Sequence, residues 1–201
     1  MEAVLTQQTS VMELDEVLET AWALLLEGVS NRKTPFHVPA VASTCIDLTP
    51  SIRTVVLRGV NKCRRTVRFH TDKRAGKYGQ LLSNPSLAFH FYDEAKRVQV
   101  RLQTTATLHN CDEVAAAAWS SSQPMSKLCY AAPISPGASV STPPPAPTLR
   151  DTDPEVGYNN FCVVEGFVLK MEWLKLSADG HQRAAFGWGE DGILISEWLA
   201  P

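Results

Sequence analysis

Apolar residues near the N-terminus recur at helical spacing. Over residues 11–28 they follow one another mostly at intervals of three and four, at Leu14, Leu18, Ala21, Trp22, Leu25 and Leu26. This period predicts an amphipathic helix over about 11–28 that packs its apolar face on the rest of the protein. We expect the helix to end at Gly28, because glycine readily adopts the left-handed conformation that closes many helices.

From Ile52 onward the pattern changes to short runs rich in β-branched and aromatic residues, separated by turn residues. The runs are SIRTVVLRG, TVRFHT, SLAFHFY, RVQVRLQTTATL and FCVVEGFVLKMEWLKL. Their composition and their bounding residues predict β-strands. Five such runs favour a mostly antiparallel sheet.

Two short helical stretches interrupt these runs. One covers about 73–82 and ends before Asn84-Pro85, because the residue preceding a proline avoids the helical conformation. The other follows Asn110, which together with Glu113 predicts a capped helix start. Strands outnumber helices and do not alternate regularly with them. We therefore expect a mainly β domain with peripheral helices, built as a closed or half-closed barrel.

A stretch rich in proline, serine and alanine covers residues 133–147. This composition is typical of an exposed loop, which we expect over about 133–157. The chain of 201 residues is long enough for one sizeable core, and no internal repeat is visible. We therefore expect a single domain over 1–201, with no linker to a second one.

The overall charge gives no reason to expect a polyanionic partner. The formal net charge is -2 and charged residues make up 20% of the chain, so no nucleic acid or membrane surface is favoured. No run approaches the roughly 20 apolar residues that cross a bilayer, and no signal peptide is recognisable. We expect a cytoplasmic protein, in which any anionic ligand is held by a local cluster of cations.

Cysteine and histidine spacing predicts no metal site. The five cysteines are odd in number and form no C-x-x-C pair, which favours scattered reduced thiols over a disulfide framework. His37, His90 and His109 are isolated in the sequence and lack the spacing of metal ligands. The Gly-rich fingerprints of dinucleotide and nucleotide phosphate sites are also absent from the sequence.

The first candidate for chemistry is the run RTVVLRG. Strand alternation predicts Arg53, Val55 and Leu57 on one face, with Thr54, Val56 and Arg58 on the other. An arginine that opens a strand can bind a phosphate with its planar guanidinium. A solvated strand end is the alternative for Arg53.

The second candidate is the segment FHTDKRAGKYGQLLSNP. It predicts a strand ending at His70 and Thr71, followed by a helix carrying Arg74 and Lys77 three residues apart. Residues at this spacing share a helix face, so both cations can point at one anion beside the backbone N–H groups of the helix start. A solvated charged face is the alternative.

The third candidate is the run RVQVRLQTTATL. Alternation predicts Arg97, Gln99 and Arg101 on one face, opposite a row of apolar side chains. A glutamine inside a sheet needs partners for both ends of its amide, and the pyrimidine edge of a flavin offers them. Ordinary cross-strand pairing would also satisfy Gln99.

Taken in order, the three segments resemble the FMN-binding core of the pyridoxamine 5'-phosphate oxidase family, and the final EWLAP resembles that family's C-terminal tail. The resemblance implies a Greek-key antiparallel split β-barrel that binds FMN at a homodimer interface. It also assigns FMN contacts: Arg53, Thr54, Val55 and Val56 on the first strand, His70 and Thr71 beside it, Arg74 and Lys77 at the phosphate, and Gln99 at the isoalloxazine ring.

Departures from the family bear on the substrate. Where the oxidase carries a tyrosine and an arginine for the substrate's phosphate, this chain has Ala117 and Ser121. The resemblance leaves Arg58, His181 and Arg183 as candidate substrate contacts. It thus implies an FMN-dependent oxidoreductase acting on a small molecule other than pyridoxamine phosphate. The alternative is a flavin-binding module without turnover, which serves storage, sensing or partner recognition.

Overall fold

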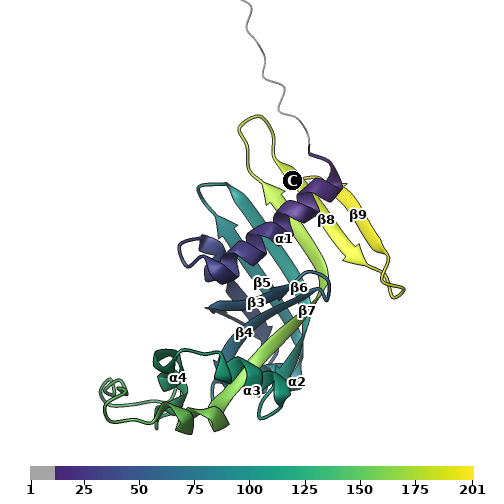
Figure 1. Cartoon of the computed structure of the whole chain (residues 1–201). Helices are drawn as coiled ribbons and strands as arrows, with labels where there is room; N and C mark the ends of the chain where they lie inside the picture. The colour runs from purple at the N-terminus through teal and green to yellow at the C-terminus, as the bar shows by residue number, and fades with distance from the viewer. Residues whose placement is uncertain (1–11) are drawn as a thin grey trace, which may run out of the picture.

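The structure is a computed structural model, and it describes residues 12–201 (Figure 1). Val11, the expected first residue of the N-terminal helix, lies outside the described residues. The helical elements are α1 (Leu14–Ser30), η1 (Pro35–His37), α2 (Gly76–Ser83), α3 (Glu113–Ser120), α4 (Pro124–Ala131) and η2 (Pro154–Asn160). The strands are β1 (Ala40–Thr44), β2 (Pro50–Thr54), β3 (Leu57–Asn61), β4 (Thr66–Asp72), β5 (Ser86–Asp93), β6 (Val98–His109), β7 (Phe161–Lys175), β8 (Gln182–Trp188) and β9 (Leu194–Leu199).

All the strands belong to one antiparallel sheet. Its main path runs β2-β1-β5-β6-β7-β4-β3, and β8 and β9 extend it from β7. The 15-residue strand β7 pairs with β4 and β6 along one part and with β6 and β8 along another, so the sheet folds over without closing. The prediction of a mainly β, antiparallel split barrel with peripheral helices is confirmed.

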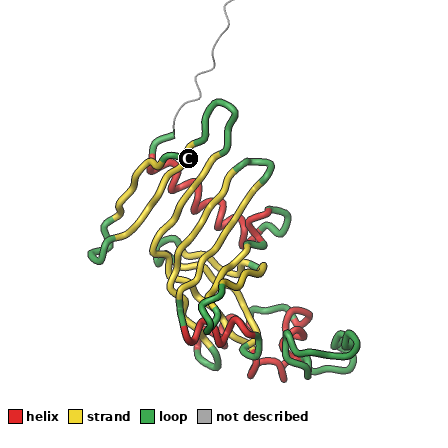
Figure 2. The backbone as a smooth tube through the Cα atoms, turned by 180° about the vertical axis from the view of Figure 1, so that it is seen from behind, coloured by secondary structure: helices red, strands yellow, loops and turns green. Residues whose placement is uncertain are grey.

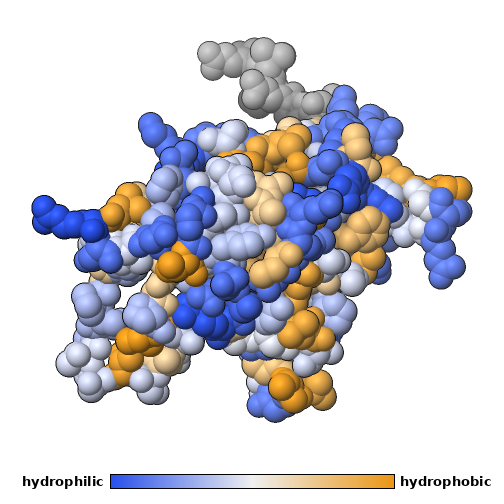
Figure 3. Space-filling view, turned by 60° about the horizontal axis from the view of Figure 1, so that its bottom comes forward, coloured by the Kyte–Doolittle hydropathy of each residue, from blue (hydrophilic) through white to orange (hydrophobic). Residues whose placement is uncertain are grey.

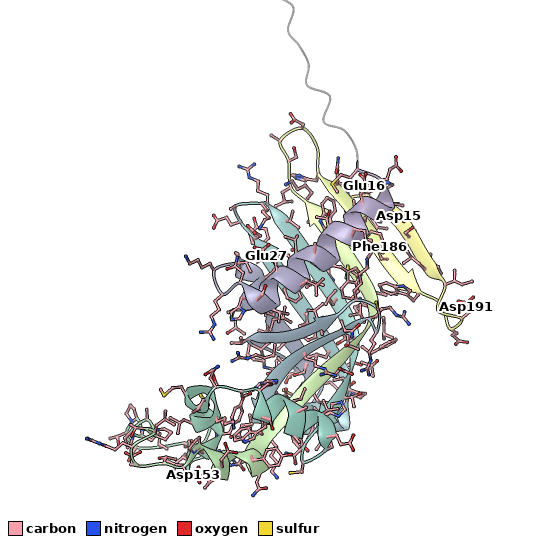
Figure 4. All side chains as sticks on the ribbon, in the orientation of Figure 1. Asp15, Glu16, Glu27, Asp153, Phe186 and Asp191 are labelled. Atoms are coloured by element: carbon pink, nitrogen blue, oxygen red, sulfur yellow. The ribbon has the colours of Figure 1, made fainter. Side chains whose placement is uncertain are left out.

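Helix α1 covers one face of this sheet, as Figure 1 shows. Its buried residues, among them Val17, Trp22 and Leu25, join one core with the inward side chains of the strands. Phe186 on β8 lies beneath the helix in Figure 4 and is 1% exposed. Burial of this apolar surface is the main stabilising contribution that the sequence pattern encodes.

The opposite face of the large sheet carries no helix among residues 12–201, as the view from behind in Figure 2 shows. Small side chains such as Ala40, Ala42 and Ala88 line a shallow pocket on this face, together with His90 and Arg101. The strict burial alternation of β5 confirms that its odd-numbered apolar residues point to the core and its even-numbered residues to this open face.

Four local expectations were wrong at element boundaries. Helix α1 runs through Gly28 to Ser30, and Gly28 is buried inside it against the backbone of Phe36 instead of ending it. The run RTVVLRG is two strands, β2 and β3, separated by Val55 and Val56. Helix α2 starts at Gly76 rather than near residue 73. The cap of α3 is Asp112, whose side chain accepts the N–H of Ala115.

The segment from α4 to η2 projects from the body of the molecule (Figure 1). It includes the exposed proline-rich loop and returns to the sheet through η2. Lys127 on α4 bonds Glu155 of η2 at 2.6 Å, and the indole of Trp119 donates to the same carboxylate at 2.6 Å. These contacts connect both ends of the projection to α3.

Candidate functional site

Arg53 lies at the centre of a cluster of neutral polar groups. From β2 its guanidinium donates to Ser43 Oγ on β1 at 2.6 Å, to Ser51 Oγ at 2.5 Å and to Gln80 Oε1 on α2 at 2.9 Å. Ser43 also donates to Gln80 Oε1, at 2.6 Å. Arg53 thus points inward from β2 and contacts α2 through the side chain of Gln80.

Lys77 is the second cation at this end of the sheet. It comes from α2, and its Nζ donates to Thr71 Oγ1 on β4 at 3.1 Å. Its amine is half-buried, and burial lowers the pKa of Lys77, with the nearby charge of Arg53 lowering it further and Asp72 opposing. Burial likewise lowers the pKa of Arg53. The two cations are therefore close enough to interact.

Arg53 and Lys77 share a second property. Within residues 12–201 neither forms an ion pair with a carboxylate, although both are half-buried. Two partly desolvated positive charges side by side are unfavourable unless an anion compensates them. The arrangement fits an anionic group such as a phosphate.

Arg74 does not share a helix face with Lys77, so that expectation was wrong. Arg74 precedes the N-cap of α2 and forms an ion pair with the buried Asp72 at 2.7 Å. Its guanidinium also donates to the carbonyls of Ala132 at 2.9 Å and Tyr130 at 3.4 Å. Hydrogen bonding to Asp72 raises the pKa of Arg74. The Arg74 guanidinium thus links the C-terminal end of α4 to Asp72 of β4 through hydrogen bonds.

Gln99 lies on the open face of the sheet, away from Arg53. The alternation predicted for Gln99 and Arg101 is confirmed, since Val98 and Val100 are buried on the other face. The placement of Arg97 on the same strand face was wrong, because Arg97 lies in the turn before β6 with a φ of 52°. His90 Nε2 and Gln99 Oε1 are 3.0 Å apart across β5 and β6. Within one copy of the chain, the structure therefore separates Gln99 from the cationic pair by the thickness of the sheet.

Thr54, Val55 and Val56, which follow Arg53 in the chain, do not all face the same side of the sheet. Thr54 pairs with Ala40 and is exposed on the open face, whereas Val55 donates its N–H to the carbonyl of Pro39 at 3.0 Å. Val56 completes the two-residue link to β3. Their backbone runs along the edge of the sheet beside Arg53.

His70 and Arg58 line a common pocket. His70 lies on β4 and packs edge-to-face on Phe161, with ring centroids 4.8 Å apart. Burial, then the charges of Arg58 and Arg68, lower the pKa of His70 to about 4. The imidazole is therefore neutral near pH 7.

The two candidates near the C-terminus have partners within the same chain. His181 is in the β7–β8 turn, where its Nδ1 accepts the N–H of Ser177 at 3.1 Å. Arg183 lies on the open face and donates to Glu172 at 2.6 Å, and Arg101 approaches the same carboxylate at 3.6 Å. Gln99 and Arg183 are both paired with Leu174 of β7, from opposite sides, so the two candidates are two strands apart in the sheet.

Sequence reasoning missed the neutral partners of Arg53, namely Ser43, Ser51 and Gln80. Gln80 follows Lys77 by three residues on α2, so helical spacing could have placed the two together. Ser43 gave no such signal, because β1 was not recognised as a strand and only the pairing of β1 with β2 brings it to Arg53.

Comparison with known protein families adds an independent observation. A family model described as pyridoxamine 5'-phosphate oxidase, FMN-binding domain, matches residues 19–110. Over these residues the chain is similar to this family. The matched segment contains Arg53, Arg58, His70, Lys77 and Gln99, whereas His181 and Arg183 lie outside it. No curated protein sequence matches the chain.

Solved structures show that the fold of the pyridoxamine 5'-phosphate oxidase family extends over nearly the whole chain. An FMN-binding protein related to pyridoxamine 5'-phosphate oxidase, from Nostoc punctiforme, is 21% identical, with a TM-score of 0.74 covering 96% of this chain and 100% of that one. PhzG from Burkholderia lata, in complex with tetrahydrophenazine-1-carboxylic acid, is 17% identical, with a TM-score of 0.68 covering 96% and 95%. A relative of general stress protein 26 from Clostridium acetobutylicum is 9% identical, with a TM-score of 0.54 covering 94% and 97%.

One further property concerns membranes. Across the described part of the chain, no helix combines the length and the apolar character needed to cross a bilayer.

Proposed function

We propose that this protein binds FMN and acts as an FMN-dependent oxidoreductase on a small molecule. The observation that carries the proposal is the pair Arg53 and Lys77, two half-buried cations that lack a carboxylate partner within residues 12–201. The family match over residues 19–110 supports the choice of FMN as the anion's source.

The residues present fit the phosphate of FMN. A phosphate monoester carries a charge between about -1 and -2 near neutral pH, so two cations can balance it. Arg53 is already oriented by Ser43, Ser51 and Gln80, and Lys77 by Thr71, which lowers the entropic cost of binding. Arg74 remains in the proposal as a positioning residue, because it holds Asp72 and the α4 end in place.

The site needs two copies of the chain. Gln99 and the pair Arg53 and Lys77 lie on opposite faces of the sheet, so one flavin can meet both sets only if they come from different copies. The open face, with its small side chains, supports a homodimer in which Gln99 of one copy approaches FMN bound at Arg53 of the other. Thr71 and the link Thr54–Val56 complete the proposed FMN contacts beside Arg53. His70 faces the other side of β4, so its proposed contact, like that of Gln99, is made to FMN bound by the other copy.

Flavin would supply the two-electron chemistry, and the protein would position flavin and substrate. Arg58 lines a pocket open to small molecules, and Arg183 lies on the same open face as Gln99. We propose Arg58 and Arg183 as substrate contacts, with His181 in the β7–β8 turn as a third. Their roles are binding and orientation, and no proton transfer is assigned to them.

The alternative function is a flavin-binding module without turnover. The observation that favours it is the wall of the pocket beside Arg58, where α3 presents Ala117 and Ala118 and no cation. A site that lacks side chains for strong substrate binding can still bind its cofactor and serve in sensing or storage. The two functions differ in whether bound flavin exchanges electrons with a small molecule.

Titration of the purified protein with FMN and with riboflavin tests the cofactor assignment. We expect FMN to bind at least tenfold more tightly than riboflavin, because only FMN carries the phosphate that Arg53 and Lys77 compensate. Equal affinities would show that the cationic pair is not the phosphate site. Oxidation of NADPH, NADH or another added reductant by the FMN-loaded protein separates the oxidoreductase from the module, for which no turnover is expected.

A further inference from the structure

A second polar pocket lies on the other side of β4 from Lys77. Its volume is about 260 Å³, and it is formed by β3, β4, the start of α4 and the loop that follows α1. The lining residues are Arg32, Arg58, His70, Ser121, Ser122, Gln123, Ser126 and Tyr130. Figure 3 turns this end of the molecule forward and shows hydrophilic residues between small apolar patches.

The charges around this pocket are positive. Arg32 and Arg58 both line it, and no lining residue is acidic. Among the residues that the structure describes, neither arginine forms an ion pair or a side-chain hydrogen bond. The nearest acids on β4 and β7 are engaged elsewhere, since Asp72 binds Arg74 and Glu165 binds Arg68.

The remaining polar groups are neutral hydrogen-bonding partners. Three serines and Gln123 come from the α3–α4 connection and the first turn of α4, and Tyr130 comes from the end of α4. The hydroxyls of Ser121 and Ser122 donate to the carbonyl of Ala118, whereas Ser126 and Gln123 make no side-chain hydrogen bond within residues 12–201. His70 is neutral near pH 7, and burial raises the pKa of Tyr130, so its phenol keeps its proton. The first turn of α4 also brings the positive end of a helix to the pocket.

We propose that this pocket binds the carboxylate group of a small-molecule substrate. Arg58 supplies a planar guanidinium whose geometry matches a carboxylate, and the Ser126 hydroxyl and the Gln123 amide complete the hydrogen bonds of that carboxylate. The inference rests on the proposed function in one respect, the identity of the ligand as the substrate of the flavin site. The binding of a carboxylate here does not require flavin.

A carboxylate suits the pocket better than a phosphate ester does. A phosphate ester carries up to two charges and three acceptor oxygens, which call for several converging cations. Here Arg32 is exposed, and the wall next to Arg58 is made by Ala117 of α3 and by Ser121, the residue that follows α3. Glu113 of α3 also lines the adjoining space and would repel a second negative charge.

Calorimetric titration of the FMN-free protein with benzoate and with inorganic phosphate tests the proposal. Benzoate is expected to bind the wild-type protein, and Arg58→Gln is expected to weaken it by about tenfold or more. Arg64→Gln is the matched control, because Arg64 is a neighbouring arginine with an exposed side chain that does not line the pocket. Circular dichroism and thermal unfolding establish that both variants fold.

NMR spectra of the histidine rings locate the ligand. Benzoate is expected to shift the ring signals of His70 in the wild-type protein and in Arg64→Gln, and His70→Gln identifies those signals. Equal benzoate affinity in folded Arg58→Gln, or unchanged His70 signals at saturating benzoate, would overturn the proposal. Tighter binding of phosphate than of benzoate would instead identify a phosphate ester site and overturn the carboxylate assignment.

The proposed function and the carboxylate pocket can be rejected separately by these measurements. Benzoate binding at Arg58 in a protein that does not take up FMN would leave the pocket established and reject the flavin site. FMN binding without benzoate binding would leave the flavin site and reject the carboxylate pocket.

Discussion

His70 and Thr71 are consecutive in β4 and face opposite sides of it. Thr71 Oγ1 accepts a hydrogen bond from Lys77 Nζ at 3.1 Å, whereas His70 lines the pocket that contains Arg58. The alternation of side chains along a strand thus places one residue of the pair at the proposed phosphate site and the other at the proposed carboxylate pocket. Two candidate anion sites share one strand.

Lys77→Met is expected to weaken FMN binding by about 10- to 100-fold, because a charge-assisted hydrogen bond to phosphate is lost. Fluorescence titration of flavin measures the effect. Lys73→Met is the matched control, since Lys73 is a neighbouring lysine that precedes α2 and makes no side-chain hydrogen bond within residues 12–201. Similar losses in both variants would point to a general effect of net charge.

Arg74→Ala is expected to reduce stability more than flavin affinity. The substitution leaves Asp72 buried without its partner, at a cost of about 3 kcal/mol in the free energy of unfolding. Urea denaturation measures that loss, and Asp72→Asn combined with Arg74→Ala should recover part of it. A drop in FMN affinity as large as that of Lys77→Met would instead indicate that Arg74 binds the phosphate directly.

Mixed dimers test whether the flavin site takes residues from two copies. Lys77→Met and Gln99→Ala are each expected to weaken FMN binding in their own dimers. A dimer that contains one copy of each variant should regain one of its two tight sites if Lys77 and Gln99 act from different copies. The number of FMN molecules bound per doubly tagged, purified mixed dimer measures this recovery. If neither tight site is recovered, Lys77 and Gln99 contact the same FMN from the same copy.

His70 should make stability fall on acidification. Its pKa is about 4 in the folded protein against 6.5 for an ordinary histidine, so between these values the unfolded chain holds a proton that the folded one does not. Stability is therefore lost as pH falls from 6.5 to 4, on the order of 3 kcal/mol from this group. Urea denaturation at several pH values should show a flatter profile for His70→Gln. His181→Gln, which removes an exposed histidine from a turn, is the matched variant, and an equal flattening in it would contradict the assignment of the effect to His70.

Gly28→Ala should destabilise the protein by about 2 kcal/mol, because overpacking cannot be relieved against backbone. A Cβ at Gly28 would lie 2.7 Å from the carbonyl oxygen of Phe36. Gly79→Ala on α2 is the control, since its Cβ would meet nothing within 4 Å and alanine favours the helix. Thermal unfolding of both variants measures the contrast, and equal midpoints would show that α1 shifts freely away from Phe36.

The sequence by itself determined the elements whose pattern is strong and local. The apolar period of α1, the alternation in β5 and β6, and the end of α2 before Pro85 are all readable from neighbouring residues, because backbone geometry fixes which side chains share a face. The order of the three segments also indicated the family that matches residues 19–110.

Only the tertiary structure decided which of the candidate residues meet. The pairing of β1 with β2 delivers Ser43 to Arg53, and the ion pair with Asp72 takes Arg74 away from Lys77. The sheet separates Gln99 from the cationic pair. These relationships depend on contacts between residues far apart in the chain or on where a helix begins, which hydrophobic spacing does not encode.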